Sequence, residues 1–108
     1  MAQPKELFRI TKVEDVALPA IGANLLATTV SPQYYATGYF RIYGALSKAG
    51  TLTVKVNDSE EVMNGGNEIG AGVAFLYDIP VTREDVVSVL FSATDGTIGR
   101  IIVDEHAG

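Results

Sequence analysis

The chain has 108 residues, which suits a single domain with one ordinary hydrophobic core. Its net charge is −5 and its eight lysines and arginines are spread singly, so no basic stripe is present to bind nucleic-acid phosphates. Cysteine is absent, which excludes disulfide bonds, thiol nucleophiles and thiolate metal ligands. We therefore expect no nucleic-acid partner, and a stability that rests on packing or on assembly with other chains.

Two further exclusions concern apolar segments. The first residues are polar and charged and lack the continuous apolar core of a secretion signal, so we expect synthesis in the cytoplasm. Residues 16–40 are uncharged, but Pro19, Gly22 and Pro32 interrupt them. A membrane-spanning helix, and with it a membrane partner, is therefore not expected.

The N-terminal part predicts strands separated by chain breaks. Residues 6–13 place Phe8 and Ile10 on one side, with the period of two that half-buried strands show. A second strand is expected over residues 25–30, because the Ser-Pro pair that follows ends extended structure. We expect the extreme ends, residues 1–5 and 106–108, to be flexible.

The clearest pattern runs from Tyr39 to Val56. Its apolar residues recur with a period of two: Phe40, Ile42, Leu46, Leu52, Val54 and Val56. Residues 47–50, Ser-Lys-Ala-Gly, supply a turn between the two runs. The segment therefore predicts a hairpin with one apolar and one polar face.

The region after this hairpin predicts turns and loop, followed by another strand. Residues 57–59 read as a turn before a polar connection, and the glycine-rich residues 64–72 read as loop with a short extended piece. Residues 73–81 return to extended structure with Phe75 and Ile79 on one face. Pro80 indicates that this strand ends there or lies at a sheet edge.

The C-terminal part predicts a second hairpin. Residues 82–85 could begin a short helix, but the β-branched and aromatic run that follows favours a turn that leads into a strand. Strands over residues 86–93 and 97–104 then meet at Asp95-Gly96.

Together these elements predict an all-β fold. We expect a single antiparallel β-sandwich or barrel over residues 1–108, jelly-roll-like, with seven to eight short strands. The residues expected to be largely buried in its core are Phe40, Ile42, Leu52, Val54, Val56, Phe75 and Phe91.

Candidate catalytic and metal-binding groups are few. His106 is the single histidine and lies near the C-terminus, so a serine–histidine–acid triad would depend on a chain end. Asp104, Glu105 and His106 are adjacent, and neighbouring residues of a strand point to opposite faces, so they cannot all bind one metal ion. We expect no catalytic residue, no metal site and no cofactor.

Carboxylates and glycines permit weaker alternatives. Glu60-Glu61 and Glu84-Asp85 lie on predicted turns or connections, where water solvates them, and a glycosidase would need two carboxyl groups facing each other. Calcium binding remains open for four loop or strand carboxylates, namely Asp58, Glu60, Asp78 and Asp95. The glycines of residues 65–72 read as turn glycines, because no Gly-Lys-Ser/Thr and no helix follow them.

Aromatic residues form the most interesting candidate surface. Tyr39, Arg41 and Tyr43 share the face of their strand that is opposite the apolar one, and Tyr34 and Tyr35 precede it. Tyrosine and arginine are enriched at protein interfaces, so we expect packing under a second sheet or a subunit interface. A sugar-binding platform is the alternative for the same residues.

Five segments within residues 23–105 resemble small β-sandwich virion proteins of tailed phages and archaeal viruses. They are Tyr39–Tyr43, Ser47–Val54, Met63–Ile69, Tyr77–Val81 before Asp85, and Ile102–Glu105. The resemblance implies a jelly-roll-like subunit that trimerises or decorates a capsid or tail, with no catalysis and no cofactor. It also implies a location in the virion after synthesis in the host cytoplasm.

The expected function is therefore a non-catalytic structural subunit of a virion or similar assembly, whose partners are copies of itself and other assembly proteins. A carbohydrate- or receptor-binding β-sandwich is the alternative, with a glycan as partner. An enzyme on a cupin-like barrel is a weaker third hypothesis, because metal-binding cupins need several histidines and this chain has one.

Overall fold

A computed structural model describes residues 7–17, 24–26, 28–93 and 98–108. Strands dominate these residues, and the prediction of an all-β fold is confirmed. The elements in chain order are β1 (Leu7–Ala17), β2 (Thr37–Leu46), β3 (Leu52–Val56), β4 (Ser59–Val62), the 3-10 turn η1 (Asn64–Gly66), β5 (Phe75–Thr82), β6 (Val87–Phe91) and β7 (Ile98–Ala107).

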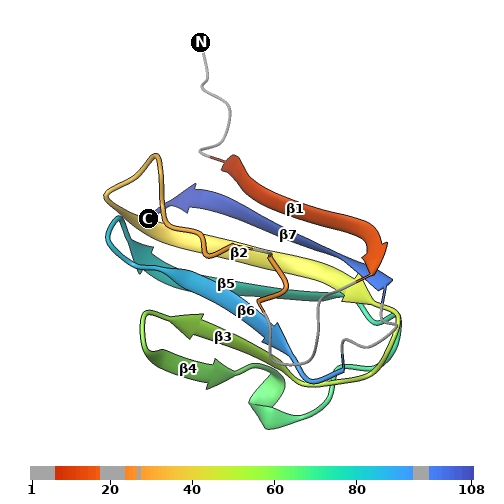
Figure 1. Cartoon of the computed structure of the whole chain (residues 1–108). Coiled ribbons are helices and arrows are strands. Elements are labelled where there is room, and N and C mark those ends of the chain that lie inside the picture. The colour runs from red at the N-terminus through yellow and green to blue at the C-terminus, as the bar shows by residue number, and fades with distance from the viewer. Residues whose placement is uncertain (1–6, 18–23, 27, 94–97) are drawn as a thin grey trace.

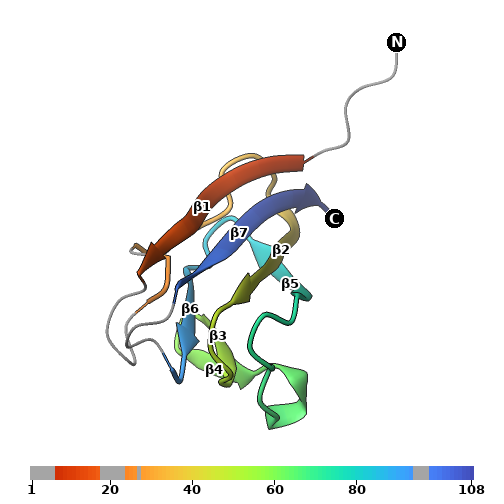
Figure 2. The ribbon, with the colours of Figure 1, turned by 90° about the vertical axis from the view of Figure 1, so that its right-hand side faces the viewer.

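The strands form two antiparallel sheets that face each other (Figure 1). Sheet A has the strand order β1-β7-β2-β5, and sheet B has the order β4-β3-β6. Figure 2 shows β1 and β7 in a different layer from β3, β4 and β6. The chain passes from one sheet to the other after β2, β4, β5 and β6. Most pairs of consecutive strands therefore belong to different sheets.

The core lies between the sheets, and among the residues whose side chains are described it takes buried residues from β2, β3, β5, β6 and β7. Six of the seven predicted core residues are buried: Phe40, Ile42, Leu52, Val54, Phe75 and Phe91. Val56 is partly exposed, because it lines an open hollow between β3, β4 and β5 at one side of the molecule. The period of two in the sequence therefore identified the inward faces correctly.

Both predicted hairpins are wrong. β2 and β3 belong to different sheets, and so do β6 and β7, while the Asp95-Gly96 turn lies outside the described residues. Two strands that cross the core show the same apolar alternation as two strands of a hairpin, because in both cases every second residue points inward. The hairpin that does form joins β3 to β4 through Asn57 and Asp58, with Asn57 at φ 55°.

The segment around residues 24–30 also differs from the prediction. The expected strand over residues 25–30 is replaced by isolated bridges from Asn24 to Leu90 and from Val30 to Val87. The described residues form seven strands, four in sheet A and three in sheet B. Conversely, the expected polar connection at Glu60 and Glu61 is strand β4.

A short turn connects β5 to β6. Residues 83–84 form the predicted turn, in which the Asp85 carboxylate accepts the backbone N–H of Thr82 at 2.8 Å. This bond, together with a weaker effect from Asn57, lowers the pKa of Asp85 below its usual value.

β7 continues through Ala107, so residues 106 and 107 are part of sheet A where a flexible end was expected. The expected flexible residues 1–5 lie outside the described residues.

Candidate functional site on the outer face of sheet A

Strands β2, β5 and β7 turn one face toward the core and the other away from sheet B. Directly paired residues of antiparallel strands lie on the same face, so the register defines the second face. We call this surface the outer face, and its residues are Tyr39, Arg41 and Tyr43 of β2, Leu76, Asp78 and Pro80 of β5, and Ile102, Asp104 and His106 of β7.

The central row of the outer face carries charge. Arg41 is paired in register with Asp78 on one side and with Asp104 on the other. Its guanidinium donates two hydrogen bonds to the Asp78 carboxylate, from Nε at 2.8 Å and from the terminal nitrogen at 3.0 Å. This bidentate geometry holds the side chains of Arg41 and Asp78 in a defined orientation.

The two flanking rows carry aromatic rings. In one, Tyr39 stacks on His106 with 4.8 Å between ring centroids, and the Arg41 guanidinium lies 5.8 Å from the centre of the Tyr39 ring. In the other, the Tyr43 hydroxyl donates a 2.6 Å hydrogen bond to the Asp104 carboxylate, which is buried. The polar groups of Arg41 and Tyr43 therefore have partners within the chain.

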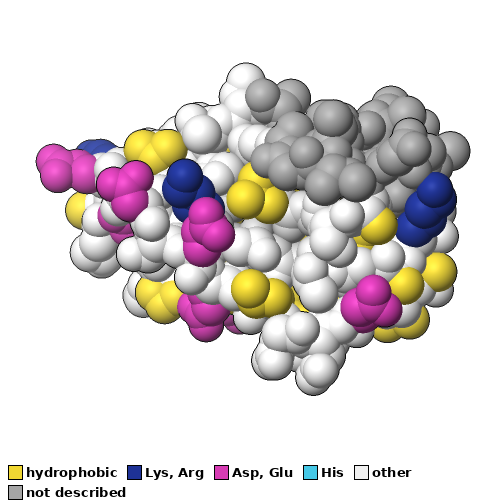
Figure 3. All heavy atoms as spheres, turned by 60° about the horizontal axis from the view of Figure 1, so that its bottom comes forward, with side chains coloured by type: hydrophobic (Ala, Val, Ile, Leu, Met, Phe, Trp, Pro, Cys, Tyr) yellow, Lys and Arg dark blue, Asp and Glu magenta, His cyan; other side chains and the backbone are white. Residues whose placement is uncertain are grey.

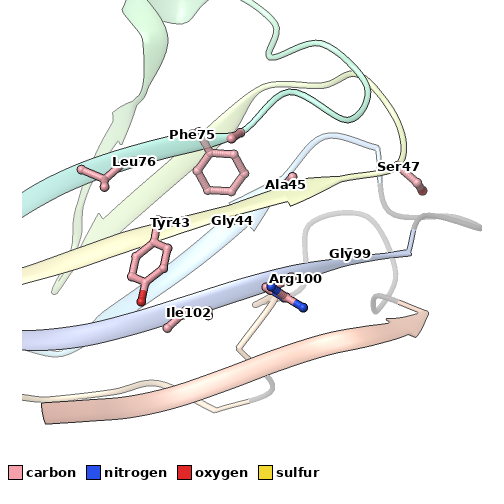
Figure 4. Close-up of a pocket in the computed structure, with 10 residues that line it drawn as sticks. Tyr43, Gly44, Ala45, Ser47, Phe75, Leu76, Gly99, Arg100 and Ile102 are labelled. Carbon is pink, nitrogen blue, oxygen red and sulfur yellow. The ribbon is translucent and has the colours of Figure 1, made fainter.

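An open hollow of about 690 Å³ adjoins the Tyr43 row. Figure 4 shows Tyr43, Leu76 and Ile102 on three neighbouring strands at this hollow, with Phe75 and Ala45 beyond them and Arg100 at its border. Leu76, on the edge strand β5, is 53% exposed. The hollow gives the outer face an apolar part beside its charged row.

The charged row makes the stability depend on pH. Hydrogen bonds from Arg41 lower the pKa of Asp78 below its usual value of about 4. Because the folded-state pKa is the lower one, the stabilisation is present above about pH 4 and is lost as the pH falls through the folded-state value.

We therefore expect Asp78→Asn to remove part of the decline in Tm between about pH 5 and pH 2. Arg41→Met should remove the same part, because it eliminates the cause of the low pKa, and the double variant should add little to either. Differential scanning calorimetry at low protein concentration measures this. An unchanged decline in Asp78→Asn would contradict the role given to the pair.

The structure separates the residues that the sequence analysis grouped. Tyr39, Arg41 and Tyr43 lie together on the outer face, whereas sheet B packs on the other face of sheet A. The expectation that these three residues pack under a second sheet of the same chain is therefore wrong. Tyr34 and Tyr35 belong instead to the loop before β2.

That loop is held by a residue that sequence reasoning missed. The Glu105 carboxylate is 1% exposed and accepts backbone N–H groups of Gln33, Tyr34 and Tyr35 at distances from 2.8 to 3.3 Å. No local pattern links Glu105 to a loop 70 residues earlier, and its neighbours Asp104 and His106 are polar, so the sequence did not mark Glu105 as a buried residue.

The adjacent Asp104, Glu105 and His106 diverge as their strand positions require. Asp104 and His106 lie on the outer face, and Glu105 points inward to the loop. Asp78, one of the calcium candidates, is paired with Arg41, while Asp95 lies outside the described residues. Among the residues that the structure describes, no group of three or more His, Asp or Glu side chains is arranged to hold a metal ion.

Comparison with protein-family models and with curated proteins finds no match for this chain. In the described part of the chain, no helix is long and apolar enough to cross a membrane.

Proposed function

We propose that this protein is a non-catalytic structural subunit that assembles with copies of itself, as part of a virion or a similar particle. The observation that carries the proposal is the outer face of sheet A. There Arg41 and Tyr43 are hydrogen-bonded to acidic side chains of the same chain, next to the exposed Leu76 and an open apolar hollow.

Such a face suits burial against another protein surface. Covering a polar group costs free energy unless it has a hydrogen-bond partner, and the Tyr43 hydroxyl and two nitrogens of Arg41 already have one. Tyrosine and arginine are also the residue types enriched in the cores of interfaces. A subunit contact can therefore cover this face without stranding the Tyr43 hydroxyl or the two Arg41 nitrogens that donate to Asp78.

The connectivity supports a jelly-roll reading of the fold. In a jelly roll the chain alternates between two packed sheets. Here β1, β2, β5 and β7 fall in sheet A, and β3, β4 and β6 fall in sheet B, with Asn24 and Val30 bridged to β6. We propose that Asn24 and Val30 mark the place of a further sheet B strand that has lost regular pairing.

The virion assignment and the number of copies come from the resemblance of Tyr39–Tyr43 and the other segments to small virion proteins. It implies a capsid, decoration or tail component that trimerises. Peptides of this chain should be recovered from purified particles in constant ratio to the other particle proteins, and their absence from particles would remove the virion part of the proposal.

Self-assembly itself has a direct test. We expect a closed homo-oligomer by multi-angle light scattering over a wide range of protein concentrations, because a closed assembly covers the outer face in every copy. A monomer at all concentrations that also binds no particle component would contradict the proposal. The measured mass at the plateau gives the number of copies.

A glycan-binding module remains the second candidate, favoured by the exposed ring of Tyr34, which is 48% accessible. The Tyr39 ring is less suitable as a sugar platform, because it stacks on His106. Glycan-array binding that is lost in Tyr34→Ala or Tyr39→Ala, by a protein that stays monomeric, would replace the assembly proposal with this one.

A further inference from the structure

We infer that two copies pair face to face through the outer surfaces of β2 and β5, about a two-fold axis that runs along the strands between them. The inference rests on the proposed self-assembly, specifies its surface, and puts a two-fold pair in place of the trimer that the resemblance implies. It follows from two independent observations, the state of the sheet edges and the arrangement of side chains on the outer face.

The edge of sheet A at β5 is poorly suited to pairing with a strand of another chain. Pro80 cannot donate to its neighbour Tyr39 on β2, so its nitrogen points to the free edge, together with the backbone groups of Leu76, Asp78 and Thr82. The N–H of Thr82 is already donated to Asp85. An added strand would therefore find backbone donors at Leu76 and Asp78 alone along this edge.

The edges at β1 and β4 carry other protective features. The register of β1 against β7 shifts twice, between Arg9 and Thr11 and between Glu14 and Val16, and such irregularities bend an edge strand. β4 has four residues, all exposed, and its Glu61 pairs with Val54 and so lies on the inward face. A short edge strand with an inward-facing charge resists strand addition.

The edge of sheet B at β6 is covered by the chain itself. The N–H groups of Val87 and Val89 are donated to the Val30 carbonyl at 2.8 Å and to the Asn24 side chain at 3.0 Å. Each of the four sheet edges is thus protected against pairing with a strand of another chain, and such pairing could continue from copy to copy without closing. We therefore expect the copies to associate through a sheet face.

The outer face is complementary to itself under one particular rotation. Its register pairs across β2 and β5 are Tyr39 with Pro80, Arg41 with Asp78, and Tyr43 with Leu76. A two-fold axis parallel to the strands and midway between β2 and β5 places each residue opposite its own register partner in the second copy. Rings then meet Pro80 and Leu76, and charges meet opposite charges.

The central row provides the charge complementarity. Arg41 of one copy faces Asp78 of the other and the reverse, so the four charges alternate in sign. The Arg41 and Asp78 side chains are 34% and 42% exposed, which leaves both able to make a second contact. A two-fold axis perpendicular to the strands would instead place like charges together. The alternating row therefore selects the axis as well as the partner, a second copy of this chain.

Another side of the molecule lacks this arrangement. On the side shown in Figure 3, which includes the bottom of Figure 1, hydrophobic side chains are scattered between acidic and basic ones. Val62 of β4 is 46% exposed and pairs with Thr53, which places it on the face of sheet B that points away from the core. Val62 is therefore a matched control for residues of the outer face.

Opposite charge reversals test the pairing. Arg41→Glu leaves two acids at facing positions of a homodimer, and Asp78→Lys leaves two bases, so each variant should self-associate roughly tenfold or more weakly than the unmodified protein. In an equimolar mixture, Glu faces Lys and Asp faces Arg, so a heterodimer should form with nearly the original affinity. Sedimentation velocity measures the association, and native mass spectrometry identifies the heterodimer. Thermal melting verifies that each variant is folded, and Val62→Glu should dimerise normally.

The outcomes separate this inference from the proposed function. A dimer that is weakened in both variants and restored in their mixture supports both. A trimer, or a dimer that is indifferent to the two reversals or is not restored on mixing, overturns the two-fold pairing and leaves self-assembly standing. A persistent monomer overturns both, and disruption by Val62→Glu alone would move the contact to sheet B.

Discussion

Replacement of Phe40 with alanine is expected to lower the free energy of unfolding by about 3–5 kcal/mol. Phe40 is fully buried, lies on the central strand β2 of sheet A, and is paired with Ile79 and Glu105 on the two neighbouring strands. Both neighbours are parts of regular strands, so the surrounding residues can collapse into the vacated space only slightly. The loss combines the missing apolar contacts with the cavity that remains.

Equilibrium unfolding in urea measures this loss, with Val62→Ala as the control. Val62 is an exposed apolar residue of β4, and its truncation should change the stability by about 0.5 kcal/mol or less. A Phe40→Ala protein with a stability close to that of the control would mean that the faces of β2 are assigned the wrong way round. The outer face would then be the buried one.

The second large effect is expected at Glu105. Glu105→Ala removes the acceptor of the backbone N–H groups of residues 33–35, whose hydrogen bonds to the buried carboxylate are partly buried. Donors that lose their partner on folding cost about 1–3 kcal/mol each where water cannot replace it, so we expect a total loss of about 2–4 kcal/mol. Glu105→Gln keeps one oxygen acceptor, so its stability should lie between that of the unmodified protein and that of Glu105→Ala.

Amide hydrogen exchange provides a local measurement that separates this role from general destabilisation. In Glu105→Ala the amides of Gln33, Tyr34 and Tyr35 should exchange faster than those of β3, which lies in the other sheet. Glu60→Ala, which removes an exposed carboxylate from β4, is the control. Uniform acceleration across the protein, or a stability loss below about 1 kcal/mol, would contradict a specific role for Glu105 in holding the loop.

The candidate site was half visible in the sequence. Alternation along residues 39–43 placed Tyr39, Arg41 and Tyr43 on one face, and the alternation of residues 75–81 implied that Leu76, Asp78 and Pro80 also share a face. That these two faces form one surface depends on the pairing of β2 with β5. Arg41 and Asp78 are separated by 37 residues, and no periodicity reports a pairing over such a distance.

The strand pairing is where sequence reasoning failed, and both failures have the same cause. The predicted hairpins assumed that strands adjacent in the chain are adjacent in a sheet, which holds for β3 and β4 and fails for β2 with β3 and for β6 with β7. The loop of two residues at Asn57 and Asp58 enforces a hairpin, whereas the longer connections permit a crossing between sheets.

By itself, the sequence determined the all-β class, the inward faces of β2, β3 and β5, and six of the seven expected core residues, because these follow from side-chain alternation. The tertiary structure alone decided the sheet order and the covering of the β6 edge by Asn24 and Val30. It also decided the burial of Glu105 under its loop and the pairing of Arg41 with Asp78 and Asp104. These features arise from contacts between distant segments. Their stability depends on which faces cover one another in the folded chain, and that is a property of the whole core rather than of any single stretch of residues.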